Sequence, residues 1–150
     1  MGNYQLHREQ VISRPIESVF AFFADARNLE RITPPWLKFS ILTPAPIEMR
    51  SGAIIEYRIG WGPVLLRWRT EILDWNPPHH FIDVQRRGPY RLWHHAHRFE
   101  AVDGGTRMSD IVEYALPLGP LGRMMHAMCV RRDLERIFDY RRNIIEQVFS

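Results

Sequence analysis

The C-terminal part of the sequence carries one long helical pattern. Apolar residues recur at helical spacing from Leu121 to Phe149, and neither glycine nor proline interrupts the run after Gly122. A helix of this length spans about 40 Å at 1.5 Å per residue, enough to cross a small sheet. Because its apolar stripe has to pack on another layer, the rest of the chain must supply a surface of matching length.

The residues before this helix supply strands. After Trp36 the apolar residues alternate with a period of two, and glycine or proline clusters separate the alternating segments. The expected strands cover residues 4–13, 39–43, 53–59, 65–75, 81–87, 87–100 and 107–114, and two short helices, 15–24 and 25–32, follow the first strand. We therefore predict an α+β fold with an antiparallel sheet of about six to seven strands.

Length and composition place limits on the class of protein. The 150 residues match one domain, expected to span 1–150, and no apolar run is long enough for a membrane span. A single cysteine, Cys129, excludes an intramolecular disulfide, and the N-terminal stretch has no signal-peptide-like apolar core. The expected location is therefore the cytoplasm, and the expected state is a monomer or a weak homodimer.

The positive charge does not indicate a nucleic-acid-binding protein. The formal net charge of +3 comes from arginines, since Lys38 is the sole lysine. Acidic residues are interspersed with the arginines through most of the chain, whereas nucleic-acid binding requires a basic patch. We expect no nucleic-acid partner.

The segment 87–100 is the first candidate for a functional strand. A two-residue period places Trp93, His95 and His97 on one face. A face with large aromatic rings and two imidazoles is typical of the wall of a small-molecule cavity, which is apolar with a few polar groups.

The turn after this strand decides which residues lie opposite the histidines. If Gly104 and Gly105 form a two-residue turn, Phe99 pairs with Asp110. A three-residue loop would place Asp110 opposite Arg98, with its carboxylate on the other face of the sheet. The sequence leaves both registers open.

Several segments resemble a known superfamily. Residues 13–23 (SRPIESVFAFF) and the closing amphipathic helix match the SRPBCC superfamily, which includes StAR-related lipid-transfer domains, pollen-allergen-type proteins and polyketide cyclases. Residues 43–47, 68–72, 81–85 and 88–99 are similar to an uncharacterised bacterial branch of it. The resemblance covers the whole chain and implies a helix-grip fold, in which a curved sheet wraps around the long C-terminal helix and encloses a cavity.

A cavity of this kind selects a set of candidate ligand-binding residues. They share a strand face with large apolar side chains, or lie at the start of the long helix, where methionines would form a deformable floor. The set is Tyr57, Trp68, Thr70, Asp83, Gln85, Trp93, His95, His97, Asp110, Tyr114, Met124 and Met128.

Three functions fit these residues. The first is a carrier or sensor of a hydrophobic or aromatic small molecule, lipid-like or polyketide-like, with no cofactor. The second is a cofactor-free cyclase, dehydratase or isomerase whose catalytic candidates are His95, His97, Asp83 and Asp110. The third is an interaction module that docks through an exposed apolar patch and binds no ligand.

Two histidines at i and i+2 on a strand are also able to chelate a metal, with Asp83 or Asp110 as a third ligand. The sequence has no cysteine ligands and no second spaced histidine pair for such a site, so we expect no bound metal. Binding without chemistry is the preferred interpretation, because buried polar networks often orient a ligand without transforming it.

Overall fold

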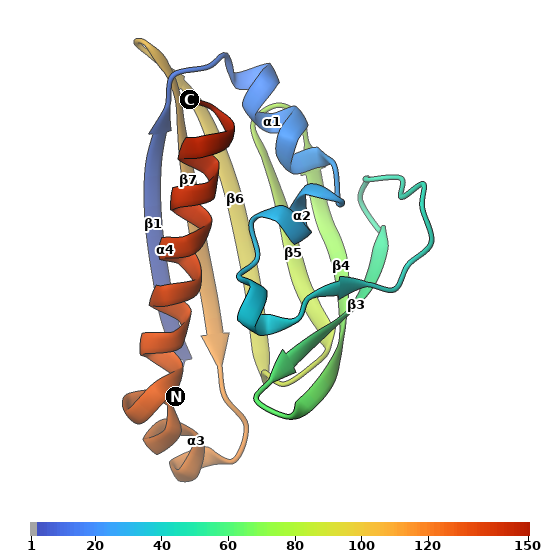
Figure 1. The fold of residues 1–150 in the computed structure, drawn as a ribbon, viewed down its shortest axis with the longest axis vertical. Helices are drawn as coiled ribbons and strands as arrows, with labels where there is room; N and C mark the ends of the chain where they lie inside the picture. Colours follow the sequence, from blue (N-terminus) through green and yellow to red (C-terminus); the bar gives the residue numbers. More distant parts are fainter. Residues whose placement is uncertain (1–2) are drawn as a thin grey trace.

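One antiparallel sheet of seven strands dominates the computed structural model, which describes residues 3–150 (Figure 1). The strand order is β1-β7-β6-β5-β4-β3-β2, so the first strand pairs with the last and every other neighbour follows in sequence. The strands are β1 (Asn3–Ile12), β2 (Ser40–Ile41), β3 (Ile54–Trp61), β4 (Val64–Asn76), β5 (His80–Arg87), β6 (Leu92–Val102) and β7 (Gly105–Ala115).

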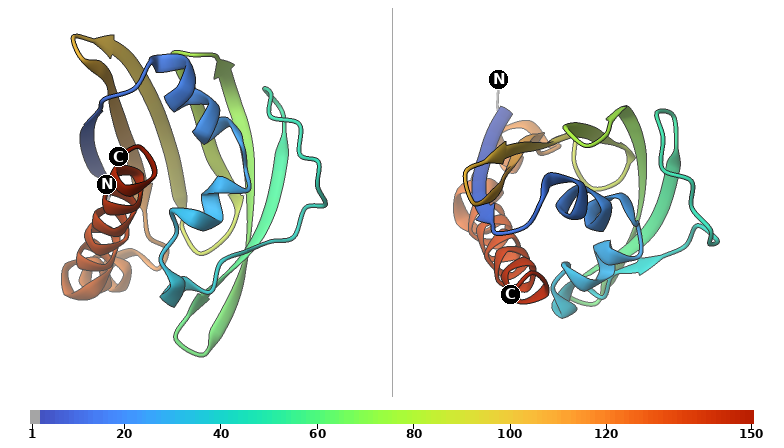
Figure 2. Two further views of the ribbon diagram at one scale, coloured as in Figure 1. Left: turned by 45° about the horizontal axis from the view of Figure 1, so that its top comes forward. Right: turned by 90° about the horizontal axis from the view of Figure 1, so that it is seen from above.

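The helices lie at two places in the chain. Helices α1 (Ile16–Ala24) and α2 (Asn28–Arg31) and the short 3₁₀ turn η1 (Pro35–Leu37) follow β1. At the C-terminus, α3 (Gly119–Met125), a π-helical turn η2 (His126–Val130) and α4 (Arg131–Val148) continue one another. The sheet curves around α1 and α2, while α4 runs along its β1 and β7 side (Figure 2). The predicted α+β helix-grip architecture is confirmed.

Helix α4 is fixed to the sheet by apolar packing and by polar contacts with β1. Leu134, Phe138 and Ile145 are buried on one stripe of the helix, and burying each such side chain stabilises the fold by about 1.5–3 kcal/mol. Arg8 of β1 donates a hydrogen bond to Asp139 (2.7 Å), and the Gln10 amide donates one to the carbonyl of Arg142 (3.1 Å). These contacts hold the helix across the sheet.

The β6–β7 hairpin differs from both predicted registers. Val102 pairs with Gly105, so Asp103 and Gly104 form the turn and Asp110 pairs with His97. Gly104 has a φ of +83°, which glycine adopts without strain. Gly105 is instead the first residue of β7, where a Cβ would lie 2.0 Å from the carbonyl oxygen of Ile12. The three-residue loop is wrong, and the two-residue turn is displaced by one position.

Other elements differ in extent from the sequence prediction. The second helix is limited to Asn28–Arg31, because the Asp25 carboxylate accepts a hydrogen bond from the backbone N–H of Arg27 (3.0 Å) and forms a turn. Strand β6 begins at Leu92 because residues 88–91 form a loop, in which Gln85 bonds both backbone groups of Tyr90.

The long C-terminal helix is present over the expected range but contains the π-helical turn. None of the helices within residues 3–150 is both long and apolar enough to cross a membrane.

Candidate functional site

A cavity of about 410 Å³ lies between the concave face of the sheet, α1–α2 and the helical C-terminal segment. Strands β3, β4, β5 and β6 form its floor and walls, and α4 closes the opposite side with Leu134, Ile137 and Phe138. The alternation of the strands explains the lining, because Ile55, Tyr57 and Ile59 of β3 all point inward. The volume lies within the range of small-molecule sites.

Aromatic side chains form one wall of the cavity. Trp68 is buried, stacks on Tyr57 with ring centroids 5.9 Å apart, and meets Trp93 edge-on at 5.3 Å. The Tyr57 hydroxyl lies 2.9 Å from the Thr70 hydroxyl. Among residues 3–150, nothing accepts a hydrogen bond from the Trp68 indole N–H, which is buried. The surrounding protein atoms enclose this donor.

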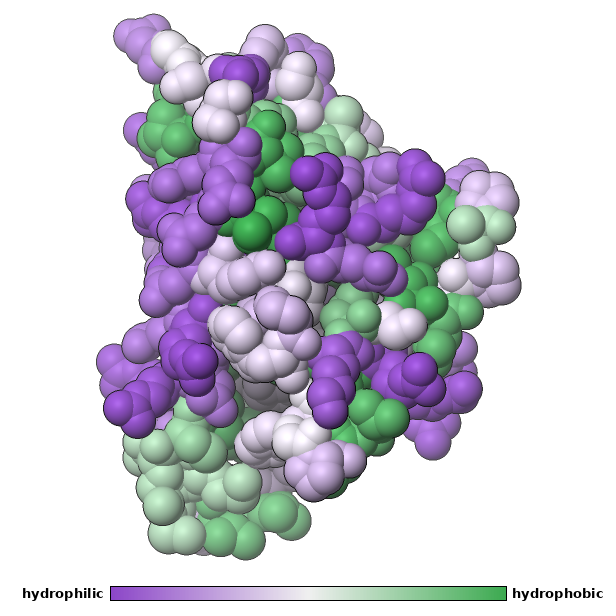
Figure 3. All heavy atoms as spheres, in the orientation of Figure 1, coloured by the Kyte–Doolittle hydropathy of each residue, from purple (hydrophilic) through white to green (hydrophobic). Residues whose placement is uncertain are grey.

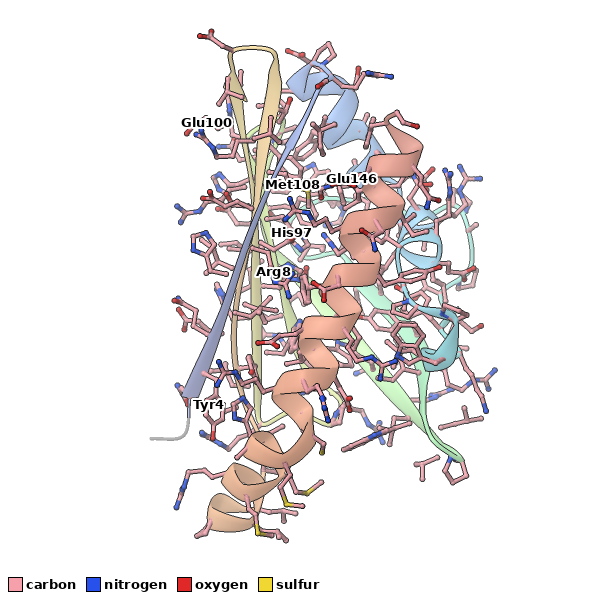
Figure 4. All side chains as sticks on the ribbon, turned by 60° about the vertical axis from the view of Figure 1, so that its left-hand side comes forward. Tyr4, Arg8, His97, Glu100, Met108 and Glu146 are labelled. Atoms are coloured by element: carbon pink, nitrogen blue, oxygen red, sulfur yellow. The ribbon has the colours of Figure 1, made fainter. Side chains whose placement is uncertain are left out.

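A buried polar cluster, consisting of Asp83, His95, His97, Asp110 and Arg141, stands beside this wall. Strand register assembles most of it: Asp83 pairs with His95 across β5 and β6, and His97 pairs with Asp110 across β6 and β7. Their side chains share the concave face of three adjacent strands. His97 lies on the side of the sheet that faces α4 (Figure 4).

Each histidine of the polar cluster bonds a different carboxylate. His95 Nε2 lies 2.8 Å from Asp110 Oδ1, and His97 Nε2 lies 2.6 Å from Asp83 Oδ2. The two imidazoles stack with ring centroids 3.7 Å apart. Arg141 donates a hydrogen bond to Asp110 Oδ1 over 3.1 Å. The result is two hydrogen-bonded groups, one that joins His95 and Arg141 to Asp110 and one that joins His97 to Asp83.

The environment of the polar cluster favours ionised carboxylates and a neutral His97. Burial raises the pKa of Asp83, but the hydrogen bond from His97 and nearby positive charge outweigh burial and hold that pKa below its usual value. For Asp110, burial acts in the same direction and is outweighed mainly by the Arg141 guanidinium, so its pKa is also lowered. Burial and the neighbouring His95 lower the pKa of His97 to about 4.

These protonation states fix the tautomer of His97. Since the ionised Asp83 accepts a hydrogen bond, Nε2 of a neutral His97 carries the proton, and Nδ1 is left as a lone pair. His97 Nδ1 is buried and has no hydrogen-bond partner among residues 3–150. His95 Nδ1 likewise makes no hydrogen bond with a described residue, but it is not among the fully enclosed polar atoms. It is therefore the ring nitrogen of the cluster that is free to meet a ligand.

The candidate ligand-binding residues fall into two groups. Seven border the cavity: Tyr57, Trp68, Thr70, Asp83, Trp93, His95 and His97. The other five, Gln85, Asp110, Tyr114, Met124 and Met128, lie outside its lining.

The residues outside the lining have other partners. Gln85 holds the loop at Tyr90, Asp110 lies behind the histidines, and the Tyr114 hydroxyl lies 2.7 Å from His126 Nε2. Met124 and Met128 are 51% and 71% exposed because α3 and η2 turn this side of the helical segment outward. Hydrophobic side chains gather at the end of the molecule where α3 lies (Figure 3).

Arg141 and Tyr90 are among the lining residues that sequence reasoning missed. Arg141 joins the polar cluster, and Tyr90 borders the cavity from the β5–β6 loop. The signal for Arg141 was its place on the apolar stripe of α4, three residues after Phe138 and four before Ile145. A charged residue at such a position needs a buried partner. Tyr90 carried no comparable signal, because its position depends on the loop.

Residues 12–139 match the model of the protein family described as "Polyketide cyclase / dehydrase and lipid transport". The chain belongs to this family. The resemblance to the SRPBCC superfamily is thereby confirmed. No curated protein matches the sequence.

Solved structures share the fold of this polyketide cyclase/dehydrase family member at low sequence identity. An aromatase/cyclase, Zhui, from a Streptomyces species is 15% identical with a TM-score of 0.75, over 97% of this chain and 92% of that one. Protein Ms6760 from Mycobacterium smegmatis is 18% identical with a TM-score of 0.70, over 96% and 89%. Ara h 8.0201 is 14% identical with a TM-score of 0.61, over 96% and 98%. These likenesses establish the fold alone.

Proposed function

We propose that the protein binds a hydrophobic or aromatic small molecule, lipid-like or polyketide-like, in the cavity and acts as its carrier or sensor. The observation that carries this proposal is the cavity of about 410 Å³ with an aromatic wall and a polar cluster on one side. Apolar walls supply the affinity for such a ligand, and a few polar groups orient it.

The polar groups favour a ligand with an oxygen atom at one end. His95 Nδ1 makes no hydrogen bond with a described residue and is the ring nitrogen of the polar cluster that is not enclosed. A hydroxyl group of a ligand would donate a hydrogen bond to this nitrogen, while the apolar part of the ligand would contact the residues of β3, β4 and α4. A pure hydrocarbon would leave this acceptor unpaired, at a cost of about 1–3 kcal/mol.

A pair of adjacent leucines on β4 provides the test. Leu66 borders the cavity, whereas Leu65 is exposed. We expect Leu66→Trp to reduce the affinity for a naphthalene sulfonate dye, and for the fatty acids and phenols that displace it, by at least tenfold. Leu65→Trp should leave these affinities within twofold. Isothermal titration calorimetry measures both, and equal effects of the two substitutions would contradict binding in this cavity.

A second candidate function is that of a cofactor-free cyclase, dehydratase or isomerase. It is supported by the pairing of His95 Nε2 with Asp110, which leaves Nδ1 available as a general base at the edge of the cavity. This nitrogen would remove a proton from the carbon next to a substrate carbonyl. Incubation with a short poly-β-ketone, followed by mass spectrometry for loss of water, tests it. His95→Gln should abolish turnover while the ligand still binds.

A further inference from the structure

Three potential metal ligands lie together at the edge of the cavity. Asp83, His95 and His97 each offer one donor atom, and these atoms lie within 4.8 Å of one another. The atoms that fit are Asp83 Oδ2, His95 Nδ1 and His97 Nε2. Two imidazoles and one carboxylate are a common set for zinc and for ferrous iron.

The separations suit a metal ion once the two imidazole rings turn toward it. Ligands at the usual distances of about 2.0–2.1 Å from a tetrahedral zinc lie about 3.3 Å from one another. Asp83 Oδ2 is 2.6 Å from His97 Nε2 and 4.0 Å from His95 Nδ1. These two distances lie on either side of the tetrahedral value, and the two imidazoles, which stack with centroids 3.7 Å apart, would turn so that both lone pairs point at one ion.

Asp110 occupies the position of a supporting carboxylate for both histidines. Its Oδ1 lies 2.8 Å from His95 Nε2 and 3.5 Å from His97 Nδ1, which are the ring nitrogens turned away from Asp83. Metal-binding histidines almost always donate their other N–H group to such a partner, which orients the ring. Arg141 holds Asp110 in place and offsets its charge.

The enclosed Nδ1 atom of His97, which makes no hydrogen bond among residues 3–150, distinguishes this cluster from a simple hydrogen-bonded pair. When His97 Nε2–H donates to Asp83, Nδ1 is an acceptor that faces the Asp110 carboxylate and has no donor within hydrogen-bond distance among residues 3–150. A metal ion bound at Nε2 would move the ring proton to Nδ1, where it would point at Asp110. This transfer of the proton would give Nδ1 a hydrogen bond to donate and the Asp110 carboxylate a hydrogen bond to accept.

We propose that Asp83, His95 and His97 form a binding site for a divalent transition-metal ion, zinc in the first instance, supported from behind by Asp110. All three ligands border the cavity, so the fourth coordination position opens toward it. The negative charges of Asp83 and Asp110 exceed the positive charge of Arg141 by one, which favours a cation. The proposal does not depend on hydrophobic-ligand binding, because the metal ion alone is the probe.

The experiment titrates the full chain, after treatment with a chelator, with zinc chloride by calorimetry and with cobalt(II) by visible absorption. We expect one ion per chain. His95→Gln and Asp83→Asn should each weaken binding at least tenfold, and Asp110→Asn should weaken it about 10- to 100-fold, as is typical of supporting residues. His94→Gln is the control, because His94 lies on the opposite face of the same strand and should leave the affinity within twofold.

A measurement on the native chain keeps the proposal testable even where a variant does not fold. Nitrogen-15 spectra of the histidine rings should show His97 with its proton on Nε2 before zinc is added and on Nδ1 afterwards. The proposal is overturned by the absence of binding at millimolar metal, by equal loss of affinity in His94→Gln and His95→Gln, or by a His97 tautomer that zinc leaves unchanged.

Discussion

Replacing Arg141 with methionine isolates the role of a buried charge. Arg141 is 7% exposed, bonds Asp110, and lies over the rings of Phe23 and Phe138 at 5.4 and 5.7 Å. Methionine preserves most of the packing but leaves Asp110 ionised without its cation. Breaking a buried ion pair by removing one partner costs about 3–5 kcal/mol, and we expect the lower end because His95 still bonds Asp110.

For a chain of this length, a loss of about 3 kcal/mol corresponds to a melting temperature lower by about 6–12 °C. Urea unfolding followed by tryptophan fluorescence gives the free energy directly. Arg142→Met is the matched control, because the neighbouring side chain is half exposed and should change stability by less than about 0.5 kcal/mol.

A double-mutant cycle separates charge from packing. If the loss comes from the uncompensated Asp110, then Asp110→Asn combined with Arg141→Met should be more stable than the sum of the single losses predicts, by at least about 1.5 kcal/mol. Additive losses, or a loss below about 1 kcal/mol in Arg141→Met, would refute the reasoning.

Two further predictions concern stability. Gly105→Ala should destabilise the protein by about 1–3 kcal/mol or more, because its Cβ would meet the Ile12 carbonyl at 2.0 Å. Gly104→Ala has open space around the new Cβ but a φ of +83°, and should cost about 1–2 kcal/mol. Urea unfolding measures both losses, and the reverse ranking would contradict this register. Burial and the positive charge of Arg131 lower the pKa of His126 from 6.5, so the unfolded chain takes up this proton first. The stability contributed by neutral His126 is therefore present above pH 6.5 and lost as the pH falls, and His126→Gln should reduce the slope of unfolding free energy between about pH 7 and pH 5; an unchanged slope would exclude His126 as its source.

The sequence predicts the layers of this fold better than its site. Strand alternation places Tyr57, Trp68 and His95 on the inner face, because a period of two leaves no choice once the apolar face is known. The order of the elements and the short turns between them were sufficient to predict that consecutive strands pair as an antiparallel meander. Whether Arg141 reaches the polar cluster depends on which turn of α4 lies over β7. Helical periodicity does not determine how far the helix is shifted along that strand.

The hairpin shows why the site was harder to predict. Asp110 meets His97 rather than Phe99 because the turn begins one residue earlier than the paired glycines suggest. Asp-Gly is a common turn pair, so the sequence Asp103-Gly104-Gly105 contains two possible two-residue turns and does not distinguish between them. In the observed register Gly105 lies on β7 close to Ile12 of β1.

The pairing of β1 with β7 has a consequence for how the chain is made. Asn3 pairs with Ala115, so the first strand has no partner until the last strand has been synthesised. At about 5–20 residues per second, that interval is about 5–20 s. Five of the ten residues of β1 are exposed in the finished protein, and Gln10 and Ile12 are its buried residues. A strand with this many exposed polar side chains is well suited to remain in water without aggregating until β7 and the helical C-terminal segment have been made.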